Sequence, residues 1–265
     1  MIGALLGDMI GSVYEFDRGG KTKDFPLFQP DSQFTDDSVM TIAVAEALLN
    51  VSAETEEETV KKEVVRQMRS WGRRYPDAGY GARFSWWLVT PDPKPYGSWG
   101  NGSAMRTSAA GWLYDTMEDT VRMARLAAEV THDHPEGLKG AMAVSAAICL
   151  ARKGSSKQEI RDHITDAYGY DLSRTCDEIR PGYHHVESCQ ETVPEAVTAF
   201  LEGNDFEDVI RTAVSLGGDC DTLTCIAGSI AEAYYGVPEW LKEECLKRIT
   251  PEMKDVLMRF ETKRR

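Results

Sequence analysis

Two short acidic motifs are the residues of this chain best suited to chemistry. The first, residues 34–38, reads FTDDS, and the second, residues 217–222, reads GGDCDT. Each places two carboxylates and a threonine hydroxyl at the start of a strongly apolar stretch. Four carboxylates can converge in a folded chain only against mutual repulsion and the cost of desolvation, so something must compensate. Oxygen ligands select hard cations, and the two motifs therefore predict a site for Mg²⁺ or Mn²⁺.

Each motif alone is also an ordinary helix start. Thr35 and Ser38 are suitable N-caps, and aspartate in a first turn favours the helix dipole. The same account covers the second motif, where Gly217-Gly218 would allow close backbone approach. The metal site is favoured because both motifs precede helices that are predicted to be central. Both sets of carboxylates would then lie at the ends of buried elements.

Helical patterns dominate the elements that must position these motifs. Residues 39–49, 141–151 and 223–235 are apolar nearly all round, which is typical of helices buried in the middle of a bundle. No stretch alternates convincingly with period two, so we expect an all-α fold. Amphipathic helices are predicted around the central ones, at residues 56–71, 119–130, 194–202, 205–216, 238–248 and 252–262. Pro194, Pro238 and Pro251 suit helix starts.

Two segments resist the helical pattern. Residues 76–103 are rich in glycine, proline and aromatic side chains, and residues 166–192 are mixed and irregular. Long loops in a compact domain are usually functional or disordered, and the aromatic content argues against disorder. Neither segment is polar enough to be a linker. We therefore expect residues 1–265 to form a single domain.

The bulk composition is that of an ordinary globular protein, with 265 residues, 42% hydrophobic and 28% charged. The net charge of −13 opposes a nucleic-acid partner, and the lysines and arginines are scattered along the sequence without a basic stripe. The N-terminal apolar run is too short and interrupted for a signal or membrane span. Six cysteines without CxxC or zinc spacing indicate a reduced compartment. These features predict a cytoplasmic protein without a membrane partner, and we expect it to be a monomer.

Four sequence blocks, in order, resemble the ADP-ribosylglycohydrolase family. The blocks are GALLGD at 3–8 running to Glu15-Phe16, FTDD at 34–37, GNGSAMR at 100–106 followed by Thr131-His132, and GGDCDT at 217–222 with Ala227-Gly228. The resemblance spans most of the chain. It implies a compact, orthogonal multi-helix bundle with a dinuclear metal centre that holds two divalent cations, Mg²⁺ or Mn²⁺.

The resemblance also implies an activity and residues for it. The positions that match the family's metal ligands are Thr35, Asp36, Asp37, Asp219, Asp221 and Thr222. Glu15 matches an acidic residue at the metal edge, and the candidates for catalysis are Glu15, Asp36 and Asp219. The implied reaction is hydrolysis at the anomeric ribose carbon of ADP-ribose, with two cations orienting the ribose and a carboxylate relaying the proton. Which carboxylate is the base stays open.

Substrate contacts are expected around the glycine-rich turn. The candidates are Trp99, Gly100, Asn101, Gly102, Ser103, Met105 and His132. Backbone N–H groups of the turn would hold the pyrophosphate, although the turn is equally a plain helix start. Trp99 would stack on the adenine or simply pack. Arg106 is assigned evenly to structure or to phosphate binding.

The sequence departs from the family pattern at two places. Cys220 stands between the two late aspartates, with its side chain expected to point away from the metals, and Ser103 replaces a smaller residue. Because no ligand position is lost, we expect an active hydrolase. The alternative is a non-catalytic ADP-ribose-binding or structural relative. The acceptor stays open among an arginine or serine side chain of an ADP-ribosylated protein and a small ADP-ribose derivative such as O-acetyl-ADP-ribose.

Overall fold

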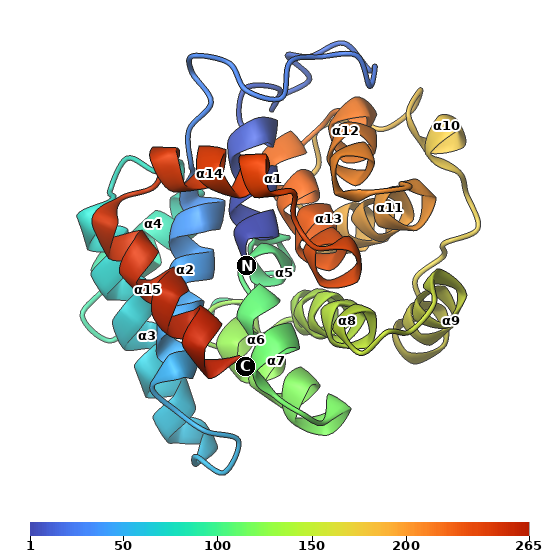
Figure 1. The fold of residues 1–265 in the computed structure, drawn as a ribbon. Helices are drawn as coiled ribbons and strands as arrows, with labels where there is room; N and C mark the ends of the chain where they lie inside the picture. Colours follow the sequence, from blue (N-terminus) through green and yellow to red (C-terminus); the bar gives the residue numbers. More distant parts are fainter. Residues whose placement is uncertain (265) are drawn as a thin grey trace.

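The computed structural model describes residues 1–264, and its regular elements there are all helices, with one isolated bridge between Gly100 and Ser188 (Figure 1). This confirms the predicted all-α fold. Within the same range, none of the helices is both long and apolar enough to cross a membrane. In chain order they are α1 Ile2–Gly11, α2 Asp36–Leu49, α3 Glu57–Arg74, α4 Ala82–Val89, α5 Gly102–Met105, α6 Ser108–Leu113, α7 Met117–Glu129, α8 Pro135–Arg152, α9 Lys157–Tyr168, α10 Cys176–Ile179, α11 Cys189–Glu202, α12 Phe206–Leu216, α13 Cys220–Tyr235, α14 Glu239–Arg248 and α15 Pro251–Lys263.

Helix α13 is at the centre of the bundle. It packs against α1, α8, α11 and α12 (Figure 1), and its residues from Cys220 to Glu232 are all buried. Helices α2 and α8 are buried along most of their length, with α3 and α15 covering α2 and α7 covering α8. The three helices predicted to be central are therefore confirmed. Their apolar faces point in all directions because other helices surround them.

The contact between α1 and α13 brings two backbones unusually close. A Cβ atom on Gly7 would lie 2.2 Å from the carbonyl oxygen of Thr224, and one on Gly11 would lie 2.5 Å from that of Cys220. No side chain fits such a gap, so these positions require glycine. The close approach brings Asp8 of α1 to the N-terminal end of α13, where the second acidic motif lies.

The two segments predicted to be irregular contain helices. Residues 76–103 include α4, which buries Phe84, Trp87 and Leu88 against the core while its other side stays exposed. Residues 166–192 include the short α10 and the start of α11. Helix α11 thus begins before the proline that was expected to start it, and Pro194 stands inside it. Pro194 was misleading because tertiary packing outweighs the local preference against helix.

Other helix starts agree with the sequence or refine it. Thr35 is the N-cap of α2, whereas Ser38, the other predicted cap, is already inside that helix. Pro238 caps α14, and Pro251 is in the first turn of α15, as expected. Helices α1 and α9 were not predicted. A capping box formed by Ser156 and Glu159 marks the start of α9, a local signal that sequence inspection can use.

Helix α3 gathers cations that are spread out in the sequence. Four of its basic residues line one shallow surface groove, at positions spaced by three or four: Lys62, Arg66, Arg69 and Arg73. This spacing places side chains on one face of a helix. The expectation that basic residues are scattered without a stripe is therefore wrong for this surface, although it describes the linear sequence.

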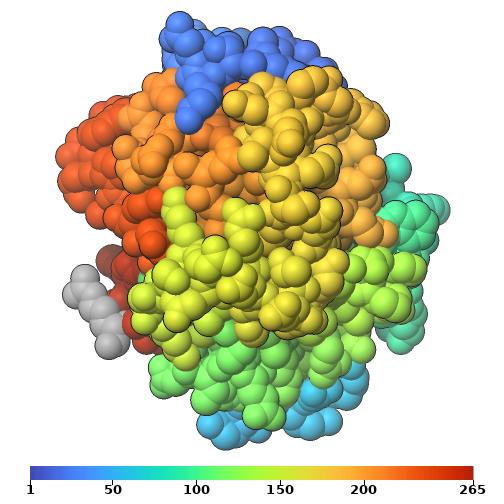
Figure 2. Space-filling model, turned by 90° about the vertical axis from the view of Figure 1, so that its right-hand side faces the viewer, coloured from blue at the N-terminus to red at the C-terminus, as the bar shows by residue number. Residues whose placement is uncertain are grey.

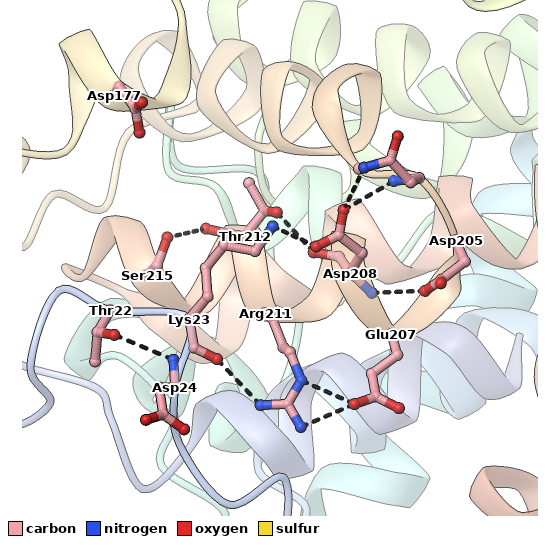
Figure 3. A network of polar contacts seen from close by, with 12 residues as sticks. Thr22, Lys23, Asp24, Asp177, Asp205, Glu207, Asp208, Arg211, Thr212 and Ser215 are labelled. Atoms are coloured by element: carbon pink, nitrogen blue, oxygen red, sulfur yellow. Dashed lines mark hydrogen bonds and ion pairs between the residues drawn. The ribbon is translucent and has the colours of Figure 1, made fainter.

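The long connection between α1 and α2 lies against α12. In Figure 2 the blue surface of early residues adjoins the orange surface of α12. The guanidinium of Arg211 on α12 donates hydrogen bonds to the carbonyl oxygens of Lys23, at 3.1 Å, and Phe25, at 2.7 Å. Figure 3 shows Arg211 reaching Lys23, whose ammonium also pairs with Asp208. These contacts fix the connection that follows Glu15.

Candidate metal centre and substrate cavity

A cavity of about 360 Å³ opens where several helix ends meet. Its walls come from the turn after α1, the first turns of α2 and α13, the start of α4, and the short α5. Most predicted site residues line it: Glu15, Asp36, Asp37, Gly100, Asn101, Gly102, Met105, His132, Asp219, Asp221 and Thr222. Among the described residues, Thr35, Trp99 and Ser103 were predicted for the site and lie outside this lining.

Carboxylates gather at one end of this cavity in two groups that share Asp221. One oxygen each from Asp8, Asp37 and Asp221 lies within 4.8 Å of the other two. The same holds for Glu15, Asp219 and Asp221. The aspartates of both groups are buried and Glu15 is half-buried. Two groups that share one carboxylate offer two adjacent positions for cations.

The donor set fits hard divalent cations. Within residues 1–264, the buried Oδ1 atom of Asp37 has no hydrogen-bond partner. Burial, followed by the charge of neighbouring aspartates, raises the pKa of both Asp37 and Asp221 well above the usual range. A buried carboxylate oxygen without a partner is costly, and a cation would satisfy it. All the ligand atoms are oxygens, as Mg²⁺ and Mn²⁺ prefer.

Asp8 is a site residue that sequence reasoning missed. It is fully buried, and its Oδ2 atom accepts hydrogen bonds from the backbone N–H groups of Thr35 and Ser38, both at 2.9 Å. Its Oδ1 atom accepts from the hydroxyl of Thr35 at 2.7 Å. Asp8 thus holds the start of α2 from another helix. The available signal was a single charge inside the apolar run of α1.

The two threonines support the carboxylates. Thr35 donates to Asp8, and the hydroxyl of Thr222 donates to Oδ2 of Asp37 at 3.3 Å. Asp36 belongs to neither carboxylate group, but it lines the cavity, and its N–H donates to the carbonyl of Ala78 at 2.8 Å. Burial, followed by the charges of neighbouring carboxylates, raises the pKa of Asp36 to about 8.

A strained turn holds Glu15 beside the second motif. Phe16 and Asp17 both have positive φ angles, 59° and 55°, which non-glycine residues rarely adopt. Two hydrogen bonds to Gly218 hold the turn. The N–H of Phe16 donates to the carbonyl oxygen of Gly218 at 3.1 Å, and the N–H of Gly218 donates to Oδ1 of Asp17 at 2.8 Å. Burial, followed by the charge of Asp219, raises the pKa of Glu15 to about 7.

The side chain between the two late aspartates points elsewhere. The thiol of Cys220 is directed at the carbonyl oxygen of Val214, 3.7 Å away. It contributes no atom to either carboxylate group. The Cys220 side chain therefore points away from both carboxylate groups, as expected.

A cationic region forms another part of the cavity wall, around Arg106. This guanidinium is buried, and its Nη2 atom donates to the carbonyls of Ala127 and Ala128 and, at 2.7 Å, to the hydroxyl of Thr131. Its Nε atom has no hydrogen-bond partner among the described residues. Burial lowers the pKa of Arg106 to about 10. A buried cation paired only with neutral groups leaves the cavity favourable to an anion.

His132 lies beside Arg106 and faces the same cavity. Its Nδ1 atom is 2.7 Å from the hydroxyl of Thr131. Burial, followed by the charges of Arg106 and Arg83, lowers the pKa of His132 well below its usual value. The imidazole is therefore neutral at physiological pH and suits a hydrogen-bonding role.

The glycine-rich turn is largely occupied by contacts within the protein. Backbone N–H groups of Gly100, Asn101 and Ser103 already donate to other protein atoms. The side-chain amide of Asn101 donates to Oδ2 of Asp219 at 2.7 Å, and Ser103 donates to the carbonyl of Gly137. The turn therefore connects the two parts of the cavity, with Asn101 reaching the carboxylates.

The aromatic candidate of this turn lies at the surface. Trp99 is 49% exposed and packs edge to face with His134, with ring centroids 5.4 Å apart. The cavity lining also includes residues that were not predicted for the site, among them Arg83, Tyr96 and His185. These three come from the two segments predicted to be irregular, where the spacing of residues in the sequence does not indicate which way their side chains point.

The all-α fold thus brings an oxygen-only carboxylate cluster to one wall of a cavity and a buried arginine to another. The chain belongs to the ADP-ribosylglycohydrolase family, whose family model matches residues 1–264. It is accordingly an enzyme, a glycohydrolase.

Relatives and solved structures of this family resemble the chain over most of its length. The human ADP-ribosylhydrolase ARH3 is 28% identical, over 92% of this chain and 87% of that protein. The ADP-ribosylarginine hydrolase Tri1 of Pseudomonas putida is 26% identical, over 92% of this chain and 72% of that protein. A solved structure described as an ADP-ribosylglycohydrolase-related protein complex matches with a TM-score of 0.70 and 25% identity, covering 100% of this chain and 96% of that one.

Proposed function

We propose that the enzyme hydrolyses the bond between the anomeric ribose carbon of ADP-ribose and an acceptor, using two divalent cations, Mg²⁺ or Mn²⁺. The observation that carries this proposal is the pair of carboxylate groups sharing Asp221 in a cavity that also contains the buried Arg106. An elongated ligand with hydroxyl groups at one end and a diphosphate further along matches that distribution of charge.

The carboxylate groups assign ligands to the two cation positions. Asp8, Asp37 and Asp221 would hold one cation, and Glu15, Asp219 and Asp221 the other. Thr35, Asp36 and Thr222, the remaining ligands implied by the family resemblance, adjoin these groups. When bound, the cations would supply orientation of the ribose hydroxyls and activation of a water.

The candidates for proton transfer are carboxyl groups at the carboxylate end of the cavity. Glu15, with a pKa raised to about 7, and Asp36, with a pKa raised to about 8, both line the cavity. Bound cations would favour the ionised carboxylates and lower both pKa values, so that each group would act as a base that takes a proton from water and passes it to the leaving acceptor. Asp219 stays with them as the third catalytic candidate, tied to Asn101.

The rest of ADP-ribose would extend toward Arg106. Arg106 and the neutral His132 would bind the pyrophosphate, while Met105 and the turn of Gly100, Asn101 and Gly102 form the adjoining wall. Trp99 would stack on the adenine from the rim, and Ser103 supports the turn from beneath.

The acceptor is proposed to be a modified arginine or serine side chain of a protein, or a small ADP-ribose conjugate. The arginine linkage in the name of Tri1 belongs to a relative 26% identical, which supports the general chemistry more than the particular linkage. We further propose one domain over residues 1–265, of which Arg265 lies outside the described residues, acting as a cytoplasmic monomer without nucleic-acid or membrane partners.

A direct assay tests this function. The protein is given arginine-linked, serine-linked and acetyl-linked ADP-ribose with Mg²⁺ or Mn²⁺, with and without chelator, and free ADP-ribose is measured. We expect release from at least one linkage, abolished by chelator and restored by added metal. Tight binding of ADP-ribose with no release from any of them would instead identify a non-catalytic binder. Undiminished turnover after chelation would contradict the role of the cations.

A further inference from the structure

A second depression lies beside the cavity, on the outer side of α4. It is a groove of about 280 Å³ whose lining includes Trp86, Trp87 and Pro93. Arg83 and Tyr96 line both this groove and the cavity, and the Arg83 guanidinium lies over the Tyr96 ring at 4.8 Å. The two depressions are therefore separated only by a shared wall of side chains.

The groove presents an unusually exposed apolar surface. Helix α4 buries one side against the core, but Trp86 is 73% exposed and Val89 on the same helix is 61% exposed. Tryptophan is enriched among the residues that dominate protein interfaces, and exposed apolar patches beside a site mark places where partners bind. The surface of α4 has the composition of a docking surface for a polypeptide.

The charge of the groove is opposite to that of the whole protein. Its lining contains two cations, Arg83 and Lys94, and no carboxylate. Lys94 pairs with Asp92 at 2.9 Å, and both groups are more than 70% exposed, so this pair holds Lys94 only weakly. On a chain with net charge −13, this local field favours acidic side chains.

The groove shares Arg83 and Tyr96 with the cationic region of the cavity, where Tyr96 packs beside His132, whereas the loop before α4 borders the carboxylate end. The loop that leads into α4 touches the carboxylate end of the cavity, since a Cβ atom on Gly79 would lie 3.4 Å from Oδ1 of Asp36. The acceptor is the part of the substrate attached at that end. A large acceptor that leaves the cavity over this rim meets the start of α4 and then the groove.

We propose that the α4 groove binds the polypeptide that surrounds the modified side chain of an ADP-ribosylated protein. An apolar side chain of this polypeptide packs on Trp86, and its acidic residues face Arg83 and Lys94. The inference rests on the proposed function and adds a substrate class to it: modified proteins with acidic sequence near the modified residue are preferred over small conjugates.

The test presents one linkage in two forms. Whichever of the arginine or serine linkages the wild type cleaves is offered on a folded acidic protein and on the free amino acid, and kcat/KM is measured for both. Trp86→Ser is expected to lower kcat/KM for the protein about ten-fold and to leave the free conjugate unchanged. Lys94→Glu lowers the value for the protein about three-fold, because it reverses one charge at the rim.

A matched control removes a comparable indole elsewhere. Trp240 on α14 is 48% exposed and lines neither the groove nor the cavity, so Trp240→Ser should match wild type on both substrates. Equal effects of Trp86→Ser on both forms, or none on either, would overturn the docking proposal and leave the hydrolase function standing. A wild-type dimer in light scattering that Trp86→Ser dissociates would also overturn it, because a second copy would then cover the groove. No release from either form by wild type refutes the function itself, and the docking proposal with it.

Discussion

The two polar regions of the cavity, the carboxylate end and the region around Arg106, have opposite charge imbalances. At the carboxylate end, side chains from separate parts of the chain crowd together, and burial raises the pKa of Asp36, Asp37 and Asp221. Around Arg106, a single buried cation is held by backbone carbonyls and a hydroxyl. The first region lacks positive charge and the second lacks negative charge. Cations would supply the positive charge that the first region lacks, and a diphosphate would supply the negative charge that the second lacks.

The largest effect is expected from a substitution that changes the carboxylate end of the cavity alone. Asp37→Asn removes a charge and replaces one carboxylate oxygen with an amide nitrogen, so we expect ADP-ribose release to fall more than about 100-fold. The rise in melting temperature on adding Mn²⁺ should disappear, while far-UV circular dichroism stays that of the wild type. Asp177→Asn, which removes an 89% exposed carboxylate, serves as the control. Full activity in the Asp37 variant would remove this residue from the metal centre.

The next largest effect is expected from a substitution that changes the cationic region around Arg106 alone. Arg106→Met removes the buried charge, and we expect KM to rise about 10- to 100-fold with the response to Mn²⁺ intact, since charged hydrogen bonds contribute about 1.5–3 kcal/mol. Arg106→Lys keeps the charge and should recover part of the loss. Calorimetric titration with ADP in metal-free buffer measures the same contribution directly. Normal ADP affinity in Arg106→Met would remove this residue from phosphate binding, and weakened metal binding would show that the two regions are not separable.

The pH dependence of the metal-free protein sharpens the comparison. In the folded state the pKa of Asp36 is raised from 3.8 to about 8 and that of Glu15 from 4.5 to about 7. The folded protein therefore binds more protons than the unfolded chain between those values, and its stability falls as pH rises from about 5 to about 8. Melting temperatures should show this fall without metal and a smaller one with Mg²⁺. In Asp36→Asn the metal-free fall should also be shallower, and an equally steep fall would contradict the assignment.

The smallest expected effect lies at the rim. If the adenine stacks on Trp99, Trp99→Ala raises KM about 2- to 10-fold at unchanged kcat, because aromatic pairs contribute about 0.5–1.5 kcal/mol. Trp240→Ala is the control for loss of an exposed indole. An unchanged KM would return Trp99 to a packing role against His134.

Much of the site could be predicted from local sequence, and the failures have physical causes. The caps and first turns of α2 and α13 depend on neighbours in sequence, so both acidic motifs were found. Asp8 was missed because its partners, Thr35 and Ser38, belong to another helix. Helix α4 was missed because its glycine- and proline-rich flanks conceal a short apolar face that only packing makes favourable.

The sequence by itself determined the helical class, the central helices and the oxygen-rich character of the site, because periodicity and side-chain chemistry are local properties. Only the tertiary structure decided how those parts meet. The glycines of α1 let its backbone approach α13, and this contact places Asp8 with Asp37 and Asp221. The tertiary structure also places Arg106 in the same cavity and leaves one side of α4 uncovered. Such relations depend on distances between segments remote in sequence, which no local pattern contains.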